Sequence, residues 1–138
     1  MKLFLDSSAL AKRYIEENGS EVVRAKCHEA AAILISAITC PEVLSGLNRL
    51  TRERKISSAN YQKLKNQLIE DQIHATIIGV HDDVILETIK CLEAASIRTL
   101  DAIQLASAIV AGCDLFLSAD SRQYDAAMVL GLTAFFIK

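Results

Sequence analysis

The sequence predicts an α/β protein, a three-layer α/β/α sandwich around a central, mostly parallel sheet of four to five strands. The chain has 138 residues, which is the length of one ordinary domain with one sizeable core. Short apolar runs alternate with longer segments of helical periodicity, and this alternation is typical of parallel strands joined by right-handed crossovers. One proline, five glycines and no repeat or low-complexity tract leave no sign of a linker. We therefore expect a single domain over residues 1–138.

Five apolar runs are expected to form the strands. In chain order they are residues 3–5, 33–35, 76–78, 115–117 and 134–137. The segments between them repeat apolar residues at helical spacing and are expected as helices. These segments are residues 8–17, 21–31, 41–54, 58–72, 82–95, 100–111 and 121–130. The sequence therefore predicts a helix or a pair of helices between every two consecutive strands.

Capping signals mark several of the helix ends. Thr39 stands three residues before Glu42, which is the spacing of a capping box, and Pro41 fits a first helical turn. Gly112 is a natural stop for the helix over residues 100–111. That helix is apolar on nearly all sides, which predicts that it is buried. Its one acidic residue, Asp101, lies in the first turn and is expected to face whatever the cleft contains.

Composition and charge exclude several classes of function. Hydrophobic residues make up 51% of the chain, but no apolar run approaches the roughly 20 residues that a membrane-spanning helix needs. The first residues lead directly into a strand-like run with no signal-peptide pattern, so we expect a cytoplasmic protein. The four cysteines and three histidines show no zinc or redox spacing. No glycine-rich nucleotide-binding motif is present.

One segment of the chain is strongly basic although the net charge is −2. Residues 49–65 carry six basic and one acidic residue, whereas residues 66–138 carry four basic and ten acidic residues. Arg49, Arg52, Arg54 and Lys55 form the densest part of this segment. A solvated helical hairpin would explain such a patch. The alternative is a surface that holds phosphate groups of a nucleic acid.

Four carboxylates carry the main functional prediction. Asp6, Glu42, Asp101 and Asp120 each lie where a predicted strand ends or a predicted helix begins. Each residue taken singly has a structural explanation as a helix cap or as a first-turn acid. An open parallel sheet, however, gathers such positions at one edge, where ligands bind. Clustered carboxylates repel one another unless a cation intervenes, so the sequence predicts a site for Mg²⁺ or Mn²⁺.

The same residues make the chain resemble the PIN domain family, and in particular the VapC-type ribonuclease toxins of toxin–antitoxin pairs. Asp6 ends an apolar strand and is followed by Ser7 and Ser8, and Glu42 opens a helix after the next strand. The most specific match is Asp101 at the start of an Ala-rich helix, followed 19 residues later by Asp120 in Ser-Ala-Asp. Two positions depart from the pattern. Ser7 stands where the family often has Thr, and Gln104 stands where it often has His.

The resemblance implies a PIN-like fold and RNA cleavage that depends on Mg²⁺ or Mn²⁺. It implies that Asp6, Glu42, Asp101 and Asp120 are the catalytic, metal-binding acids, with Asp6 and Asp101 as the most direct ligands. The serines beside them would support the carboxylates by hydrogen bonds; these are Ser7, Ser8 and Ser118. The basic residues Arg49, Arg52, Arg54 and Lys55 would contact RNA phosphates.

The resemblance also implies an RNA substrate, a cognate antitoxin and a homodimer as partners, with no membrane. One alternative is a PIN-like protein-binding module with little or no nuclease activity, and another is a housekeeping RNA-processing nuclease. Phosphoryl transfer of the haloacid dehalogenase type is disfavoured because Ser8 occupies the position where that class has a second Asp. A receiver domain is disfavoured because Asp6 stands alone at the first strand.

Overall fold

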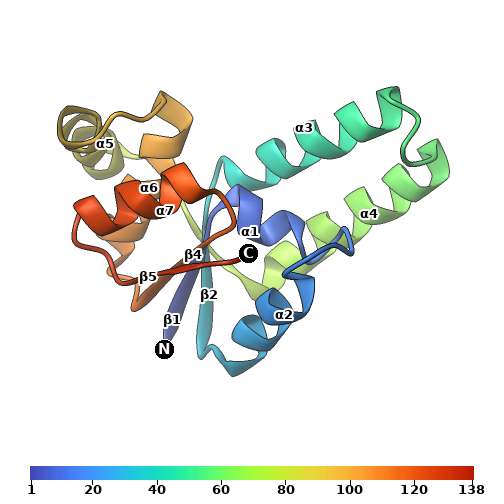
Figure 1. Cartoon of the computed structure of the whole chain (residues 1–138), viewed down its shortest axis with the longest axis horizontal. Coiled ribbons are helices and arrows are strands. Elements are labelled where there is room, and N and C mark those ends of the chain that lie inside the picture. The colour runs from blue at the N-terminus through green and yellow to red at the C-terminus, as the bar shows by residue number, and fades with distance from the viewer.

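The computed structural model describes residues 1–138, and helices separate every two consecutive strands (Figure 1). The strands are β1 (Lys2–Leu5), β2 (Ala32–Ser36), β3 (Thr76–Ile78), β4 (Leu115–Ser118) and β5 (Ala134–Phe136). The helices are α1 (Ser7–Ala11), α2 (Ser20–Glu29), α3 (Thr39–Arg52), α4 (Ser58–Asp71), α5 (Asp82–Ala94), α6 (Thr99–Ala111) and α7 (Ser121–Val129), with a short 3-10 helix, η1 (Gln72–His74), before β3.

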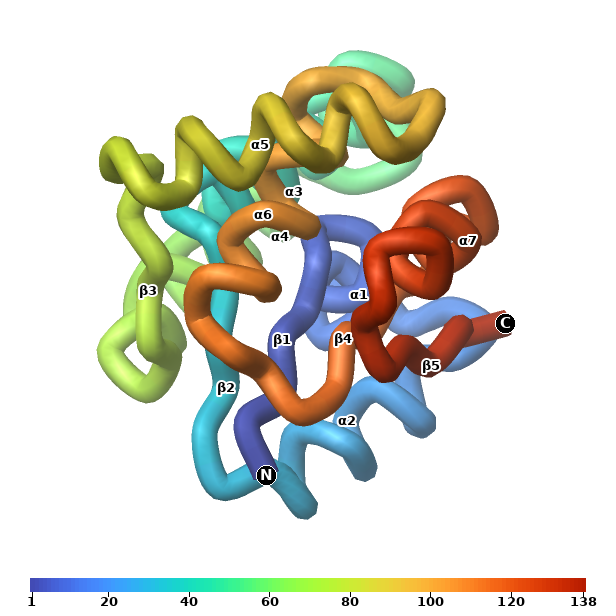
Figure 2. The backbone as a smooth tube through the Cα atoms, turned by 90° about the vertical axis from the view of Figure 1, so that its left-hand side faces the viewer, coloured from blue at the N-terminus to red at the C-terminus, as the bar shows by residue number.

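All five strands are parallel and lie in the order β3-β2-β1-β4-β5 (Figure 2). From β1 the chain builds the sheet in one direction through β2 and β3, and then crosses to the other side of β1 to add β4 and β5. The direction of building therefore reverses between β1 and β4. In open parallel sheets, ligands bind outside the carboxyl ends of the strands at this reversal.

Alternating side chains divide the core into two layers. Leu3 and Leu5 of β1 are fully buried among residues of α1, α2, α3 and α4. Phe4 faces the opposite side, where α5, α6 and α7 pack, and its ring stacks on that of Phe116 with the centroids 5.5 Å apart. Burying a side chain of this size stabilises a fold by roughly 2–3 kcal/mol. The predicted three-layer α/β/α sandwich with a parallel sheet is confirmed.

Two local predictions are wrong. The helix expected over residues 8–17 ends at Ala11, because Lys12 Nζ and Ser20 Oγ bind the backbone and side chains of the following turn instead. The capping box is also absent. Ile38, and not Thr39, is the N-cap of α3, and its apolar side chain cannot make a capping bond. Thr39 lies inside the helix, where its Oγ1 donates to Gln104 Oε1.

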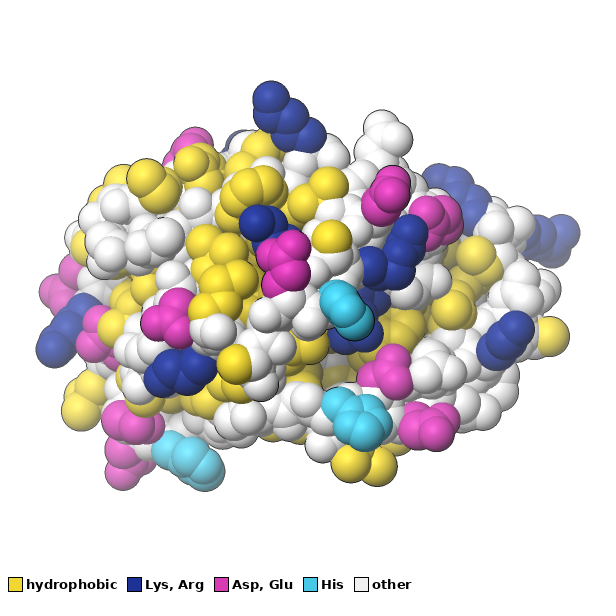
Figure 3. All heavy atoms as spheres, turned by 90° about the horizontal axis from the view of Figure 1, so that it is seen from below, with side chains coloured by type: hydrophobic (Ala, Val, Ile, Leu, Met, Phe, Trp, Pro, Cys, Tyr) yellow, Lys and Arg dark blue, Asp and Glu magenta, His cyan; other side chains and the backbone are white.

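The helical hairpin of α3 and α4 extends beyond the sheet and carries much of the basic segment (Figure 1). On the face seen from below, acidic and basic side chains are interspersed among apolar patches (Figure 3). No single helix is long and apolar enough to cross a membrane; α5 and α6 together have the length and composition, but they are bent by 118° at their junction.

Candidate metal-dependent active site

The fold brings the four predicted acids to the carboxyl edge of the sheet. Asp6 follows β1 and is the N-cap of α1, and Asp120 follows β4 and is the N-cap of α7. Glu42 lies in the first turn of α3, and Asp101 lies in the first turn of α6. Together they line one cavity of about 170 Å³ that has no hydrophobic residue in its wall. The remaining lining residues are Ser7, Ser8, Gln104 and Gln123.

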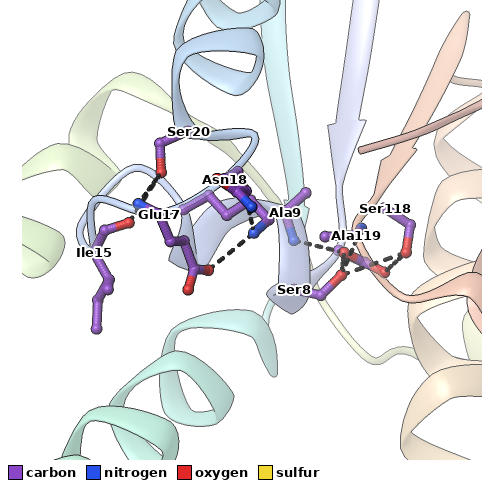
Figure 4. Close-up of polar contacts among 10 residues, drawn as sticks. Ser8, Ala9, Ile15, Glu17, Asn18, Ser20, Ser118 and Ala119 are labelled. Atoms are coloured by element: carbon purple, nitrogen blue, oxygen red, sulfur yellow. Dashed lines mark hydrogen bonds and ion pairs between the residues drawn. The ribbon is translucent and has the colours of Figure 1, made fainter. Parts of the chain in front are cut away.

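Asp6 is the most tightly held of the acids, with an exposed fraction of 3%. Its Oδ1 accepts hydrogen bonds from Ser8 Oγ at 2.6 Å and from the Ala9 backbone N–H at 2.9 Å. Its Oδ2 accepts from Ser118 Oγ at 2.5 Å. Ser8 also accepts from the Ala119 N–H, which joins the first turn of α1 to the segment after β4 (Figure 4). These contacts fix the orientation of Asp6.

Glu42 is held by a separate group of neutral donors. Its Oε1 accepts from Ser7 Oγ at 2.6 Å and from Gln104 Nε2 at 2.9 Å. Gln104 is 2% exposed, and its amide also bonds to Ser7 Oγ and Thr39 Oγ1. The amide therefore joins α1, α3 and α6. Glu42 Oε2 has no protein partner and remains available to the cavity.

Asp101 and Asp120 are more accessible. Asp120 Oδ1 accepts from the backbone N–H groups of Arg122 and Gln123 at the start of α7. Asp101 Oδ2 lies 3.5 Å from the Nε of Arg98, whose side chain is 88% exposed. The Gln123 amide donates to the Asp101 backbone carbonyl, but its Oε1 is buried and has no partner.

The electrostatics of the cavity favour a bound cation. Burial, with a smaller contribution from the charge of Asp120, raises the pKa of Asp6 to about 6 against the opposing effect of its hydrogen bonds. Burial also raises the pKa of Asp101, where Arg98 opposes the shift and Asp120 and Glu42 add to it. The carboxylates thus disfavour one another's charge. A cation among them would reverse that effect.

The basic residues predicted to contact RNA lie apart from the acids. Arg54 and Lys55 line a different cavity at the turn between α3 and α4, which shares no residue with the acidic one. Arg49 and Arg52 are exposed on α3, and Arg52 lies ten residues beyond Glu42, roughly 15 Å along the helix axis. Their contact with RNA stays a prediction.

Three residues beside the acids were given no role in the site from the sequence, although Gln104 was noted as a departure from the family pattern. Gln104 lies three residues after Asp101 on α6. Gln123 lies three residues after Asp120, in the first turn of α7. Side chains at this spacing share a helix face, so the spacing alone could have indicated both. Arg98 lies three residues before Asp101 and could have been found by the same rule.

A family comparison matches this arrangement over most of the chain. The model of the PIN domain family matches residues 3–128, which include all four acids. The chain belongs to the PIN domain family. Among curated proteins, a relative of this PIN-domain chain is Ribonuclease VapC46 of Mycobacterium tuberculosis, which is 31% identical over 132 residues and is matched over 94% of this chain and 93% of its own.

Solved structures of low sequence identity share the PIN fold. A toxin–antitoxin complex from Klebsiella pneumoniae superposes with a TM-score of 0.73 at 14% identity, covering 99% of this chain and 98% of that one. VapC20 from Mycobacterium tuberculosis, described as a sarcin-ricin loop cleaving toxin, superposes with a TM-score of 0.70 at 15% identity, covering 90% of this chain and 94% of its own. At these identities the likeness concerns the fold alone.

Residues that could bind a divalent cation line the acidic cavity. They are not arranged as a complete set of direct ligands, because no group of three or more His, Cys, Asp and Glu side chains has the geometry to hold an ion. Mg²⁺ usually keeps several waters and takes only one or two carboxylates directly. A polar cavity lined by four carboxylates, with an unpartnered buried amide oxygen at its wall, fits a hydrated ion of this kind.

Proposed function

We propose that this chain is a ribonuclease that depends on Mg²⁺ or Mn²⁺, and the toxin of a toxin–antitoxin pair. The observation that carries the proposal is the meeting of Asp6, Glu42, Asp101 and Asp120 in one polar cavity at the reversal point of the sheet. Membership of the PIN domain family and the likeness to a curated ribonuclease over 94% of the chain support it.

The acids divide into two proposed roles. Asp6 and Asp101 would hold the ion most directly, as the family resemblance implies: Asp6 lines the cavity with both oxygens oriented by protein donors, and Asp101 has only Arg98 as a charged partner. Glu42 and Asp120 each have one oxygen occupied by protein donors and one oxygen without a partner. Such an oxygen can accept a proton from water and orient it toward a phosphate.

The bound ion would supply positive charge that offsets the phosphodiester's repulsion from the acids and that lowers the pKa of water. The chain's own residues supply position. Ser8 and Ser118 hold Asp6, and Ser7 and Gln104 hold Glu42, so both carboxylates keep one orientation while substrate enters. Hydrolysis by an oriented water would leave a 5′-phosphate and a 3′-hydroxyl.

The proposed partner is a cognate antitoxin, supported by structural neighbours that are toxin–antitoxin complexes, among them one from Klebsiella pneumoniae. A cytoplasmic setting is part of the proposal, and the four free cysteines suit a reducing compartment. The homodimer expected from the family resemblance stays a prediction, which light scattering of the purified chain would test.

The deciding experiment is cleavage of a mixed RNA pool by the purified protein with Mg²⁺, with Mn²⁺ and with EDTA. Asp101→Asn is run alongside, with its folding checked by circular dichroism. We expect metal-dependent cleavage that this variant lacks. A folded, partner-free protein that cuts no RNA under any condition would contradict the proposal and favour the protein-binding module. Cleavage without toxicity in cells that lack the antitoxin would favour a housekeeping nuclease.

A further inference from the structure

A second and larger cavity opens beside the acidic one. Its volume is about 580 Å³, within the usual range for a ligand site. It lies between the segment that leads into α6 and the start of α7. Asp101, Asp120 and Gln123 line both cavities, so the two cavities adjoin at these residues. The other lining residues are Ser96, Ile97, Arg98, Ser121 and Arg122.

The wall of this cavity has the composition of a site for a phosphate ester. Only one of its eight lining residues is hydrophobic. Arg98 and Arg122 bring two guanidinium groups, and Arg122 takes part in none of the ion pairs of the chain. Arg98 is bound only loosely to Asp101, at 3.5 Å, and its side chain is 88% exposed. Both arginines can therefore turn toward a phosphate without leaving a buried partner unpaired.

We propose that this cavity binds the nucleotide next to the scissile bond, and that Arg98 and Arg122 contact the phosphate of that nucleotide. The inference rests on the proposed ribonuclease function, because the acidic cavity fixes where the scissile phosphate lies. Because the two cavities share a wall, the next unit of the strand would lie here. Gln123 lines both cavities and so stands where they adjoin.

The alternative occupant is a segment of a partner protein. An apolar groove would favour such a segment, since peptide recognition by a groove usually relies on hydrophobic anchors. This wall has Ile97 alone to offer. Arginines, serines and an amide are instead the groups that contact phosphate and sugar in nucleic-acid complexes. The chemistry of the wall therefore favours single-stranded RNA.

The cavity also brings two arginines next to two of the acids. Arg98 and Arg122 border Asp101 and Asp120 directly, whereas Arg54 lies in a cavity that shares no residue with either of these two. The arginines of the larger cavity would hold RNA next to the cut. The basic segment on the α3–α4 hairpin could then reach only phosphates farther along the strand.

The test compares the full-length protein with Arg122→Gln and Arg98→Gln. Arg24→Gln is the matched control, because Arg24 is an exposed arginine on α2, paired with Glu16 and outside both cavities. KM and kcat are measured on a single-stranded RNA pool with Mg²⁺. Binding of the same RNA is measured by fluorescence anisotropy at several salt concentrations. Every variant is made in the Glu42→Gln background, so that the RNA stays uncut and the wall of the larger cavity is unchanged.

We expect Arg122→Gln to raise KM about three- to fivefold while kcat changes less than about twofold. The plot of log affinity against log salt has a negative slope, and we expect Arg122→Gln to make this slope shallower by about 0.7, the value for one lost phosphate contact on a single strand. Arg98→Gln should make the slope shallower by a similar amount, and Arg24→Gln should match the parent protein in both measurements.

The proposal is overturned if both arginine variants keep the parent's KM and salt slope. It is also overturned if they lose affinity for a co-expressed partner protein while RNA binding is unchanged. Failure of the ribonuclease function itself has a different signature, which is the absence of cleavage by the unmodified protein. In that case an arginine-dependent salt slope in the binding measurement would still support an RNA site in this cavity.

Discussion

The acids of the cavity serve both the fold and the site, so structural and functional explanations of them are not exclusive. Asp6 caps α1 through the Ala9 N–H, and Asp120 caps α7 through two backbone N–H groups. Each cap occupies one face of the carboxylate and leaves further lone pairs directed elsewhere. Asp6 and Asp120 each lie in a turn that ends a strand and begins a helix at the ligand-binding edge of the sheet. This position lets one carboxylate cap the helix and also face the cavity.

The two tasks of Asp120 can be separated by substitution. Asp120→Asn keeps an oxygen for the capping bonds, whereas Asp120→Ala loses them and should cost about 1 kcal/mol of stability. Both substitutions remove the charge and should lower cleavage to a similar degree. Thermal unfolding and initial rates of RNA cleavage measure the two effects. If Asp120→Asn cleaved as fast as the parent protein, Asp120 would be a cap and nothing more.

Asp6 makes the stability of the metal-free protein depend on pH. Burial raises its pKa to about 6 from the ordinary value of 3.8, so the folded state binds this proton more tightly than the unfolded state. Its contribution is fully present below pH 3.8 and is lost as pH rises through about 6, a loss of about 3 kcal/mol. Urea unfolding in EDTA between pH 4 and pH 7 should show this decline, and Asp6→Asn should flatten it. An equal decline in Asp6→Asn would assign the effect to other groups.

At the scale of elements, α6 organises the site more than any other helix. It is buried through its middle and presents both Asp101 and Gln104 to the cavity. Gln104 connects it to Ser7 of α1 and to Thr39 and Glu42 of α3. The three helices come from distant parts of the chain, and this one amide gives them a common reference point. A neutral amide also holds Glu42 without adding a charge.

Gln104→Leu should therefore affect more than packing. It removes the partner of three buried or half-buried groups, which should cost about 1–3 kcal/mol of stability. Cleavage should also fall, mainly through kcat, because Glu42 would lose one of its two donors. Gln67→Leu, at an exposed position on α4 with one bond to Asp71, is the matched control and should change stability by less than about 0.5 kcal/mol. Equal effects of the two substitutions would contradict a special role for Gln104.

At the scale of the whole molecule, the fold could be predicted from the sequence because its signals are local. Each expected strand overlaps an observed one, because the apolar runs are short and distinct. The runs that precede Asp6 and Asp120 are examples. The gathering of the four acids followed from parallel topology alone. The larger cavity and the Gln104 contacts could not be predicted, because they depend on how side chains 62 to 97 residues apart are oriented. The end of α1 was missed because side-chain bonds in the following turn outweigh helical periodicity.

The clustered carboxylates at the sheet edge lead to a prediction about the stability of the whole molecule. An ion that binds the folded state alone stabilises it by an amount that grows with its concentration, by about 2.7 kcal/mol at a hundred times its dissociation constant. Mg²⁺ should therefore raise the melting temperature of the protein. Asp101→Asn should melt at the parent's temperature or higher in EDTA, since it removes a charge from a repulsive cluster, but it should lose most of the rise with Mg²⁺. Differential scanning calorimetry with and without the ion measures both quantities. A rise with Mg²⁺ that survives in Asp101→Asn would place the ion elsewhere, because Asp101 would then contribute nothing to holding it.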